Sequence, residues 1–184
     1  MDTVQTRAAR MGDARALAVL HVETWRAAYR GLLPEALLAS LDVDSREQNW
    51  RQILSEGDAV MVAERGSHLL GFSSYGTSRD DDASPGVGEL FAIYVSPAAW
   101  GTGVGRQLHD LAAEALTSSG CTEATLWVLD GNERARRFYE RCDWRHDGRV
   151  KTDEMVGATL TEVRYRRSLP LNGEMVSPVV TDLM

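Results

Sequence analysis

The sequence predicts an α+β fold, within the wider α/β class, in which helices flank a mixed and mostly antiparallel central sheet. Three observations lead to this prediction. A β-prone run at residues 90–95 is followed by a glycine turn and a helical pattern. Pairs of neighbouring β-prone runs on either side of this stretch predict hairpins. Further helical patterns lie between the runs, as expected for one mixed domain of 184 residues.

The N-terminal part of the chain predicts a strand and three helices. Residues 3–8 alternate enough for an opening strand, and Asp13 can cap a helix that runs to about Tyr29. Pro34 suits the start of a second helix, because the N–H that it lacks is not needed there. Residues 45–48, Ser-Arg-Glu-Gln, form a capping box that begins a third helix. The entry region is therefore expected to be helical.

A hairpin and a loop are predicted next. Residues 59–63 and 69–75 are β-prone runs with a short polar connection, which predicts an antiparallel pair. Residues 79–86 combine three aspartates with serine, proline and glycine, and this composition is typical of an exposed loop. The aspartates could attract a cation, but we expect them to be solvated.

The centre of the chain, residues 89–119, predicts a strand, a glycine turn and a helix around which the other elements are arranged. Gly101, Gly103 and Gly105 occupy alternate positions in the turn. Glycines permit positive φ angles and remove every Cβ from one side, so backbone N–H groups can converge at the start of the helix. Such a turn can hold an anion, most plausibly a phosphate. An ordinary strand-to-helix turn is the alternative.

The C-terminal part predicts a strand, a helix and a closing hairpin. Residues 122–128 are β-prone, and Asn132 can cap the helix that follows. Residues 144–150 and 159–166 are the two β-prone runs of the hairpin. Residues 169–184 contain two prolines and no clear period, so we expect a loose tail or an arm onto a partner.

The composition excludes several classes of protein. A content of 43% hydrophobic and 26% charged residues is typical of a soluble globular domain, and no apolar run approaches the roughly 18 residues of a membrane helix. The net charge of −7 opposes nucleic-acid binding. Two cysteines are too few for a disulfide framework, and the four histidines lack metal-ligand spacing, so we expect a cytoplasmic protein with no metal.

Two motifs occur together in the second half of the chain. Residues 100–105, Trp-Gly-Thr-Gly-Val-Gly, stand at a predicted helix start, and a second helix begins at Asn132 as Asn-Glu-Arg-Ala-Arg-Arg-Phe-Tyr-Glu. The pair resembles the GCN5-related N-acetyltransferase (GNAT) family, whose CoA-binding motif is Arg/Gln-x-x-Gly-x-Gly/Ala. Trp100 stands where the family usually has Arg or Gln. Asp143 and Trp144 replace the family's Gly-Phe turn, and Asp tolerates the left-handed conformation that such a turn requires.

The resemblance implies the acetyltransferase fold, with one N-acetyltransferase domain over residues 3–168 and a tail over 169–184. It also implies acetyl-CoA as the co-substrate. Backbone groups of the central strand would bind the pantetheine arm, and the amides of residues 101–106 would bind the diphosphate. The residues assigned in this way to the co-substrate are Ile93, Val95, Trp100, Gly101, Thr102, Gly103, Val104, Gly105, Arg106, Asn132 and Tyr139.

The implied reaction is direct transfer of the acetyl group to a primary amine in a ternary complex. The amine must attack as the neutral base, so one residue must accept its proton and another can protonate the leaving thiolate. Tyr139 is the predicted acid, and Glu89 the predicted base, acting through a water chain. A core tyrosine and a solvated strand-end carboxylate are the alternatives, and other carboxylates, Glu23 among them, stay open as the base.

Trp25 and Tyr29 lie one helical turn apart and share a face. Spacing alone favours a core pair, whereas the resemblance implies that the first helices form the acceptor side, which makes both rings predicted substrate-binding residues. The acceptor is a small-molecule or peptide amine. Two other hypotheses are a non-catalytic acyl-CoA-binding module of the same fold and an acyltransferase for another acyl-CoA. A homodimer is left open.

Overall fold

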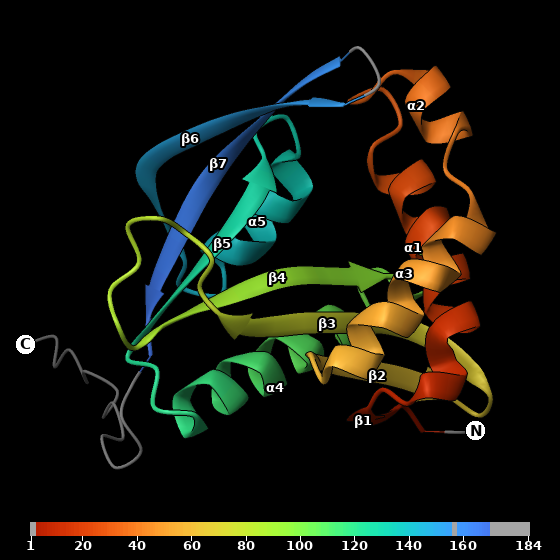
Figure 1. Cartoon of the computed structure of the whole chain (residues 1–184), viewed down its shortest axis with the longest axis horizontal. Helices are drawn as coiled ribbons and strands as arrows, with labels where there is room; N and C mark the ends of the chain where they lie inside the picture. The colour runs from red at the N-terminus through yellow and green to blue at the C-terminus, as the bar shows by residue number, and fades with distance from the viewer. Residues whose placement is uncertain (1–2, 156–157, 170–184) are drawn as a thin grey trace, which may run out of the picture.

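The computed structural model describes residues 3–155 and 158–169, which form one seven-stranded sheet with helices (Figure 1). The strands are β1 (Gln5–Ala8), β2 (Ala59–Arg65), β3 (His68–Thr77), β4 (Val87–Val95), β5 (Glu123–Leu129), β6 (Arg145–Met155) and β7 (Ala158–Ser168). The helices are α1 (Ala14–Ala28), α2 (Glu35–Ala39), α3 (Val43–Glu56), α4 (Val104–Ser118) and α5 (Glu133–Glu140), with 3-10 turns η1 (Met11–Asp13) and η2 (Pro97–Ala99). The element order agrees with the sequence prediction.

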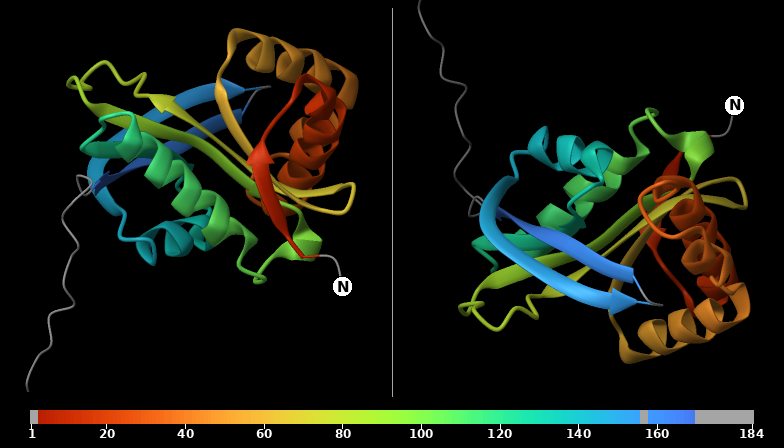
Figure 2. Two further views of the ribbon diagram at one scale, coloured as in Figure 1. Left: turned by 90° about the horizontal axis from the view of Figure 1, so that it is seen from below. Right: turned by 90° about the horizontal axis from the view of Figure 1, so that it is seen from above.

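The helices cover both faces of the sheet (Figure 2). We call the side with α1 and α3 the α1 face, and the side with α4 and α5 the α4 face. We call the part of the sheet formed by β5, β6 and β7 the β5–β7 arm. α2 extends from the end of α1 toward this arm, where Leu37 and Leu38 pack with Leu129 and Leu160. In the part of the chain that the structure describes, no helix is both long and apolar enough to cross a membrane.

The sheet divides at its centre. Its strands follow the order β1-β2-β3-β4-β5-β7-β6, and only β4 and β5 are parallel neighbours. These two strands pair only from Val87 to Glu89 and from Glu123 to Thr125, and they diverge beyond that point (Figure 1). We call this divergence the β4–β5 fork. The second half of β4 therefore has an unpaired edge that faces the fork.

A bulge sets the direction of the side chains along that half of β4. Ser74 pairs with Ala92 and Tyr75 with Leu90, which leaves Phe91 as an extra residue. Because the extra residue shifts the alternation, Leu90 and Ile93 both pack into the core of the α4 face. Beyond the bulge, the even-numbered residues of β4 face α1 and the odd-numbered ones face α4.

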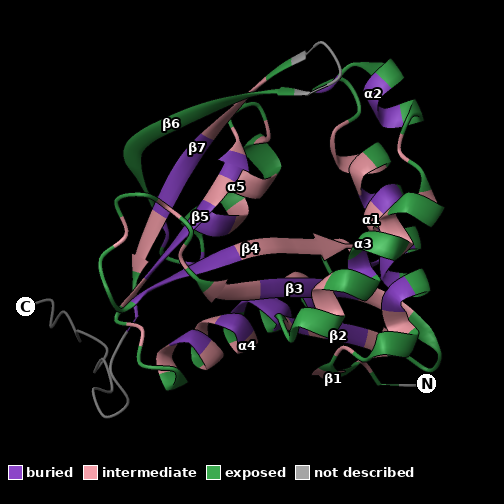
Figure 3. Ribbon diagram, in the orientation of Figure 1, coloured by how far each residue is buried: buried purple, intermediate pink, exposed green. Residues whose placement is uncertain are grey.

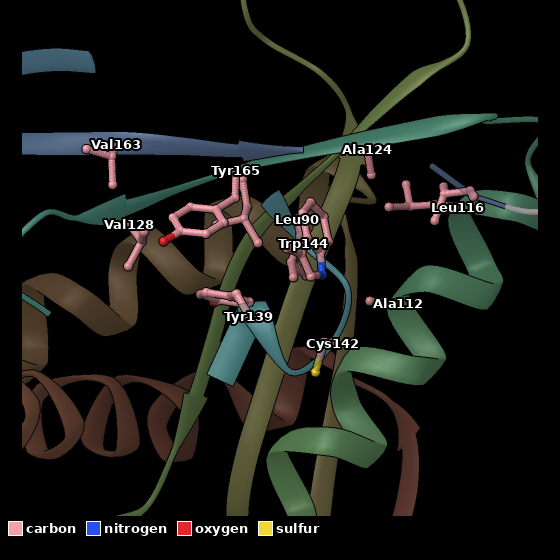
Figure 4. Close-up of a cluster of buried hydrophobic side chains, with 12 residues drawn as sticks. Leu90, Ala112, Leu116, Ala124, Val128, Tyr139, Cys142, Trp144, Val163 and Tyr165 are labelled. Atoms are coloured by element: carbon pink, nitrogen blue, oxygen red, sulfur yellow. The ribbon is translucent and has the colours of Figure 1, made fainter. Parts of the chain in front are cut away.

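Separate cores stabilise the two faces (Figure 3). On the α4 face, α4, α5 and the strands of the β5–β7 arm enclose a cluster that includes Tyr139, Trp144 and Tyr165 (Figure 4). On the α1 face, α1, α3, β2 and β3 enclose Leu17, Trp50, Phe72 and their neighbours. Leu169 is also buried, and its N–H donates to the carbonyl of Thr122 at 2.8 Å. The rest of the predicted tail, 170–184, lies outside the described residues.

The start of α3 differs from the prediction. The helix begins at Val43, and its cap is Asp42, whose carboxylate accepts a hydrogen bond from the N–H of Ser45 at 2.7 Å. The expected capping box at 45–48 is therefore inside the helix. Asp42 is in an extended conformation, in which an aspartate can satisfy a free N–H of the first turn. An aspartate three residues before the apparent box was the missed signal.

The acidic loop at 79–86 is not simply solvated, as was expected. Asp80 and Asp82 bind the guanidinium of Arg164 on β7 at 3.1 and 2.7 Å, and Asp80 also accepts from the indole N–H of Trp127 at 2.8 Å. Arg164 is only 3% exposed, and a buried cation needs opposite charges beside it. The loop thus fastens onto the β5–β7 arm, and the cation it binds belongs to the chain itself.

Candidate active site

The glycine turn before α4 presents free backbone donors. Gly101 and Gly103 adopt left-handed conformations, with φ of 75° and 91°. Within the described chain, the N–H groups of Gly101, Gly103 and residues 104–106 donate to no main-chain carbonyl. A Cβ placed on Gly101 or Gly103 would meet nothing within 4 Å, so the turn is open on that side. Converging free donors beside open space fit an anionic group such as a diphosphate.

The unpaired edge of β4 lies next to this turn. The N–H of Ser96 donates to the carbonyl of Leu70 on β3 at 2.8 Å. Because backbone groups alternate along a strand, those of Ile93 and Val95 point the other way, toward the fork. The carbonyl of Val95 already accepts the indole N–H of Trp100 at 2.7 Å. The N–H of Val95 and both backbone groups of Ile93 remain for a bound chain such as pantetheine.

Helix α5 completes this side of the site. Asn132 caps it by accepting the N–H of Ala135 at 3.1 Å, as predicted, and its side-chain amide N–H groups are left for other partners. A Cβ at Gly105 would lie 3.6 Å from the side chain of Val95 and 3.7 Å from the ring of Phe138. The glycine turn, the end of β4 and α5 therefore converge at one place.

Tyr139, the predicted acid, lies on the buried side of α5. Burial, with smaller contributions from Tyr94 and Cys142, raises the pKa of its phenol far above the ordinary value. The hydroxyl is therefore protonated at neutral pH. Among the described residues, no hydrogen-bond partner of this hydroxyl contributes to the shift of its pKa. It is a proton donor held in the apolar surroundings of Phe138 and Trp144.

Aromatic residues of α1 and β4 line the opposite side. The rings of Trp25 and Tyr29 are 5.0 Å apart and roughly perpendicular, and the ring of Tyr94 lies 6.4 Å from Trp25. Trp25 and Tyr29 are half-buried and pack against the leucines of α2. Burial raises the pKa of both Tyr29 and Tyr94, so these phenols are neutral hydrogen-bonding groups. The sequence interpretation did not include Tyr94, which takes part in this surface from the even-numbered side of β4.

Glu89, the predicted base, is only 4% exposed and lies where β4 and β5 diverge. Its carboxylate accepts from the N–H of Arg79 at 2.9 Å and from the guanidinium of Arg79 at 3.1 Å. Arg79 therefore covers it. Glu162 on β7, which binds Lys151 at 3.2 Å, is a second candidate carboxylate, and its charge adds to the effect of burial in raising the pKa of Tyr29 and Tyr94. Glu162 was not singled out from the sequence, since nothing in its spacing distinguishes it from other strand residues. Glu23 is exposed.

A cavity of about 280 Å³ lies on the α1 face, lined by α1, α3, β3 and β4. His21 and Trp50 are on its wall, and the two ring nitrogens of His21 and the indole N–H of Trp50 are buried with no partner among the residues described. Burial lowers the pKa of His21 to about 3, so its ring is neutral. Four aromatic rings surround it at centroid distances of 5.0 to 6.0 Å: Trp25, Trp50, Phe72 and Tyr94.

The turn after α5 uses the Asp-Trp pair that was noted in the sequence. Asp143 adopts the left-handed conformation with φ of 64°, as its tolerance of that region predicted. The indole N–H of Trp144 donates to Nε2 of His109 at 2.9 Å, and Nδ1 of His109 lies 2.8 Å from Asp110. His109 therefore carries its proton on Nδ1, and its ring joins α4 to the start of β6. Burial lowers its pKa, so the ring is neutral.

No cluster of three or more His, Cys, Asp or Glu side chains suited to a metal ion occurs in residues 3–155 and 158–169. A divided mixed sheet with a free-amide turn beside the division defines a transferase of the acetyltransferase fold.

Comparison with known proteins identifies the family. The model of the Acetyltransferase (GNAT) family matches residues 3–144, so the chain belongs to that family. It is 33% identical over 162 residues to the uncharacterized N-acetyltransferase YuaI of Bacillus subtilis, covering 87% of this chain and 90% of the relative. It is 31% identical over 173 residues to the probable N-acetyltransferase Rv2775 of Mycobacterium tuberculosis, covering 91% and 96%. The predicted family and the prediction of an acyltransferase are confirmed.

A solved structure supports the fold. The PaiA N-acetyltransferase of Thermoplasma acidophilum, in complex with coenzyme A, superposes with a TM-score of 0.65 at 19% identity, over 90% of this chain and 99% of that one. At this level of identity the likeness concerns the fold alone. The predicted α+β acetyltransferase fold is confirmed.

Proposed function

We propose that the protein transfers the acetyl group of acetyl-CoA to a primary amine, by direct attack in a ternary complex. The observation behind this proposal is the group of free amides at Gly101, Gly103 and 104–106, which adjoins the unpaired edge of β4. The coenzyme A bound to the Thermoplasma relative supports the same co-substrate. Acetyl-CoA supplies the acetyl group as a thioester.

The chain's own residues divide the binding work. The free amides of the turn and the N-terminal end of the α4 dipole hold the diphosphate. The backbone of Ile93, the N–H of Val95 and the side-chain amide of Asn132 are positioned for the polar groups of the pantetheine arm. The N–H of Val95 also serves to polarise the thioester carbonyl, because a fixed donor costs no reorganisation during the reaction.

Tyr139 donates the proton that the departing thiolate needs. Its raised pKa keeps the phenol protonated, and its hydroxyl has no competing partner among the described residues. The phenol thus has a proton ready when negative charge develops on sulfur. The amine loses its proton on the opposite side of the fork, so acid and base do not compete for one position.

Glu89 accepts the proton of the amine through water, because Arg79 covers its carboxylate. Glu162 is the other carboxylate at this site. A low-pH limb in kcat/KM that disappears in Glu89→Gln and persists in Glu162→Gln would support Glu89 as the base, and the reverse would favour Glu162. Trp25 and Tyr29 form the wall along which the acceptor amine lies, and a small-molecule or peptide amine fits this description.

A thiol-release assay with acetyl-CoA and a panel of primary amines tests the proposal, with acceptors that include polyamines, amino acids, aminoglycosides and N-terminal peptides. Amine-dependent release of CoA, with acetylated amine found by mass spectrometry, is the expected result. Tight binding of acetyl-CoA without turnover on any acceptor would instead support the non-catalytic sensing module. Turnover with a longer or acidic acyl-CoA but not with acetyl-CoA would support the other alternative.

A further inference from the structure

An arginine side chain stacks on the indole ring of Trp100. The guanidinium carbon of Arg134, from the first turn of α5, lies 3.3 Å from the centroid of the Trp100 indole. The indole itself is fixed, because its N–H donates to the carbonyl of Val95. This stack joins α5 to Trp100, the residue directly before the glycine turn, in which Gly101 and Gly103 face open space.

Arg134 differs from Arg106 on α4 and from the other two arginines of α5, because no carboxylate in the described parts of the chain binds it. Arg106 binds Asp110 at 2.8 Å, Arg136 binds Asp130 at 2.6 Å, and Arg137 binds Glu133 at 2.9 Å. Partial burial against the indole lowers the pKa of Arg134, and no acidic neighbour opposes that shift. The pair therefore presents a cation whose hydrogen-bond donors are free.

We propose that Arg134, held flat on Trp100, binds a phosphate group of the CoA co-substrate. This inference rests on the proposed function and extends it to a side chain outside the glycine turn. It also gives Trp100 a purpose at the position where Arg or Gln was expected. The indole of Trp100 supports the guanidinium, and the positive charge comes from Arg134 on α5.

The stack favours binding for two physical reasons. A guanidinium stacked on an indole has one face covered, while the N–H donors at its edge stay free for phosphate oxygens. Its torsion angles are already restricted before the ligand arrives, so less conformational entropy is lost on binding. A charged donor beside five neutral amides also strengthens a site that otherwise depends on dipoles alone.

Calorimetric titration of the whole protein with CoA and with 3′-dephospho-CoA tests the proposal. In Arg134→Gln the Kd for CoA is expected to rise about 10-fold or more, the range of a charged hydrogen bond. Arg137→Gln, on the same helix and paired with Glu133, is the matched control and is expected to change Kd less than about 2-fold. Raising the salt concentration is expected to weaken wild-type binding more than binding by Arg134→Gln.

The two ligands identify the phosphate. An equal loss with CoA and with 3′-dephospho-CoA means that Arg134 binds the diphosphate, and a loss seen only with CoA means that it binds the 3′-phosphate. Trp100→Leu should weaken CoA binding as well, and the effect of Arg134→Gln should shrink in that background. If Trp100→Leu does not fold, the single variant Arg134→Gln still decides.

The negative outcomes are distinct. Wild-type affinity in Arg134→Gln, with both ligands and an unchanged circular-dichroism spectrum, overturns the role of Arg134 and leaves the proposed function standing. Failure of the wild-type protein to bind CoA overturns both.

Discussion

The two faces of the sheet treat their buried polar groups differently. On the α4 face, His109 is 1% exposed and has partners at both ring nitrogens, Asp110 on one side and Trp144 on the other. On the α1 face, both ring nitrogens of His21 are buried without a partner among the described residues. The buried side-chain atoms that lack partners, within the described chain, all belong to α1 or α3: those of His21, Thr24, Trp25 and Trp50.

This difference indicates which face a ligand or water completes. Buried polar groups are almost always hydrogen-bonded in native proteins, and each exception calls for an explanation. On the α4 face the buried ring of His109 already has its partners, which suits the fixed frame of a co-substrate site. The α1 face carries its unpaired atoms around a cavity and beside the aromatic wall at Trp25 and Tyr29. We interpret it as the face that adapts to the acceptor.

The largest expected effect is on the α4 face. His109→Phe removes the acceptor of the Trp144 indole N–H and leaves that donor buried and unpaired. We expect the free energy of unfolding to fall by about 3 kcal/mol, measured by urea denaturation. The double variant with Trp144→Phe should lose less than the sum of the single losses, because it removes both partners. Simple additivity would mean that the hydrogen bond does not stabilise the turn.

Tyr139→Phe should give the next largest effect, on catalysis. The ring and its packing beside Phe138 are kept, so stability should change little, while kcat should fall about 10²-fold with KM for acetyl-CoA nearly unchanged. Because burial raises the pKa of Tyr139, the wild-type kcat should show no loss from this group up to about pH 10. A wild-type kcat in the variant, measured where chemistry limits turnover, would make Tyr139 a packing residue only.

A smaller effect is expected from the aromatic wall of the α1 face. Trp25→Ala or Tyr29→Ala should raise KM for the amine about 10-fold, as expected for a lost aromatic contact, and leave KM for acetyl-CoA within about 2-fold. Val19→Ala, at an exposed position on the same helix, is the control for general disturbance of α1. Equal changes in both KM values would mean that the two rings are core residues and do not bind the acceptor.

The smallest effect at neutral pH is expected at His21. His21→Phe removes no hydrogen bond to a described residue, so stability at pH 7 should change by less than about 0.5 kcal/mol. At low pH the wild-type protein and His21→Phe should differ in stability. The folded pKa of about 3 lies below the unfolded value of 6.5, so the unfolded chain takes up the proton first, and His21 weakens the wild-type fold as the pH falls from about 6.5 toward 3.

This loss amounts to about 1.4 kcal/mol per pH unit and should be absent in His21→Phe. Urea denaturation of both proteins at pH 7, 5.5 and 4.5 measures it. Parallel pH dependence in the two proteins would show that the ring is not held neutral, and the contrast between the two histidines would then lose its basis.

Much of the fold could be predicted because its signals are local. The apolar period of α4, the glycines before it and the cap at Asn132 each depend on a few neighbouring residues. The contacts that could not be predicted join distant positions. Arg164 meets Asp82 across 82 residues, and His109 meets Trp144 across 35. No periodicity records such a pair, so the acidic loop was expected to be solvated.

The candidate site divides in the same way. The free amides of the glycine turn and the position of Tyr139 follow from motifs, whereas Tyr94, Glu162 and Arg134 become distinguishable only when the strands and helices are assembled. Arg134 is one of three arginines on α5, and two features separate it from Arg136 and Arg137: its contact with Trp100 and, among the described residues, the lack of a carboxylate partner. The hydrogen bonds from Arg79 to Glu89 could not be predicted from the sequence either, because their geometry depends on how the loop after β3 folds back.

The extra residue at Phe91 precedes a stretch of β4 in which alternate side chains face opposite sides of the sheet. Beyond it, one strand presents Ala92 and Tyr94 to the α1 face, where we propose that the acceptor binds, and Ile93 and Val95 to the α4 face, which we propose for the co-substrate. Under the proposed function, substitutions at 92 and 94 would change the acceptor side while the co-substrate side keeps its residues, so a new acceptor specificity would not require loss of the reaction.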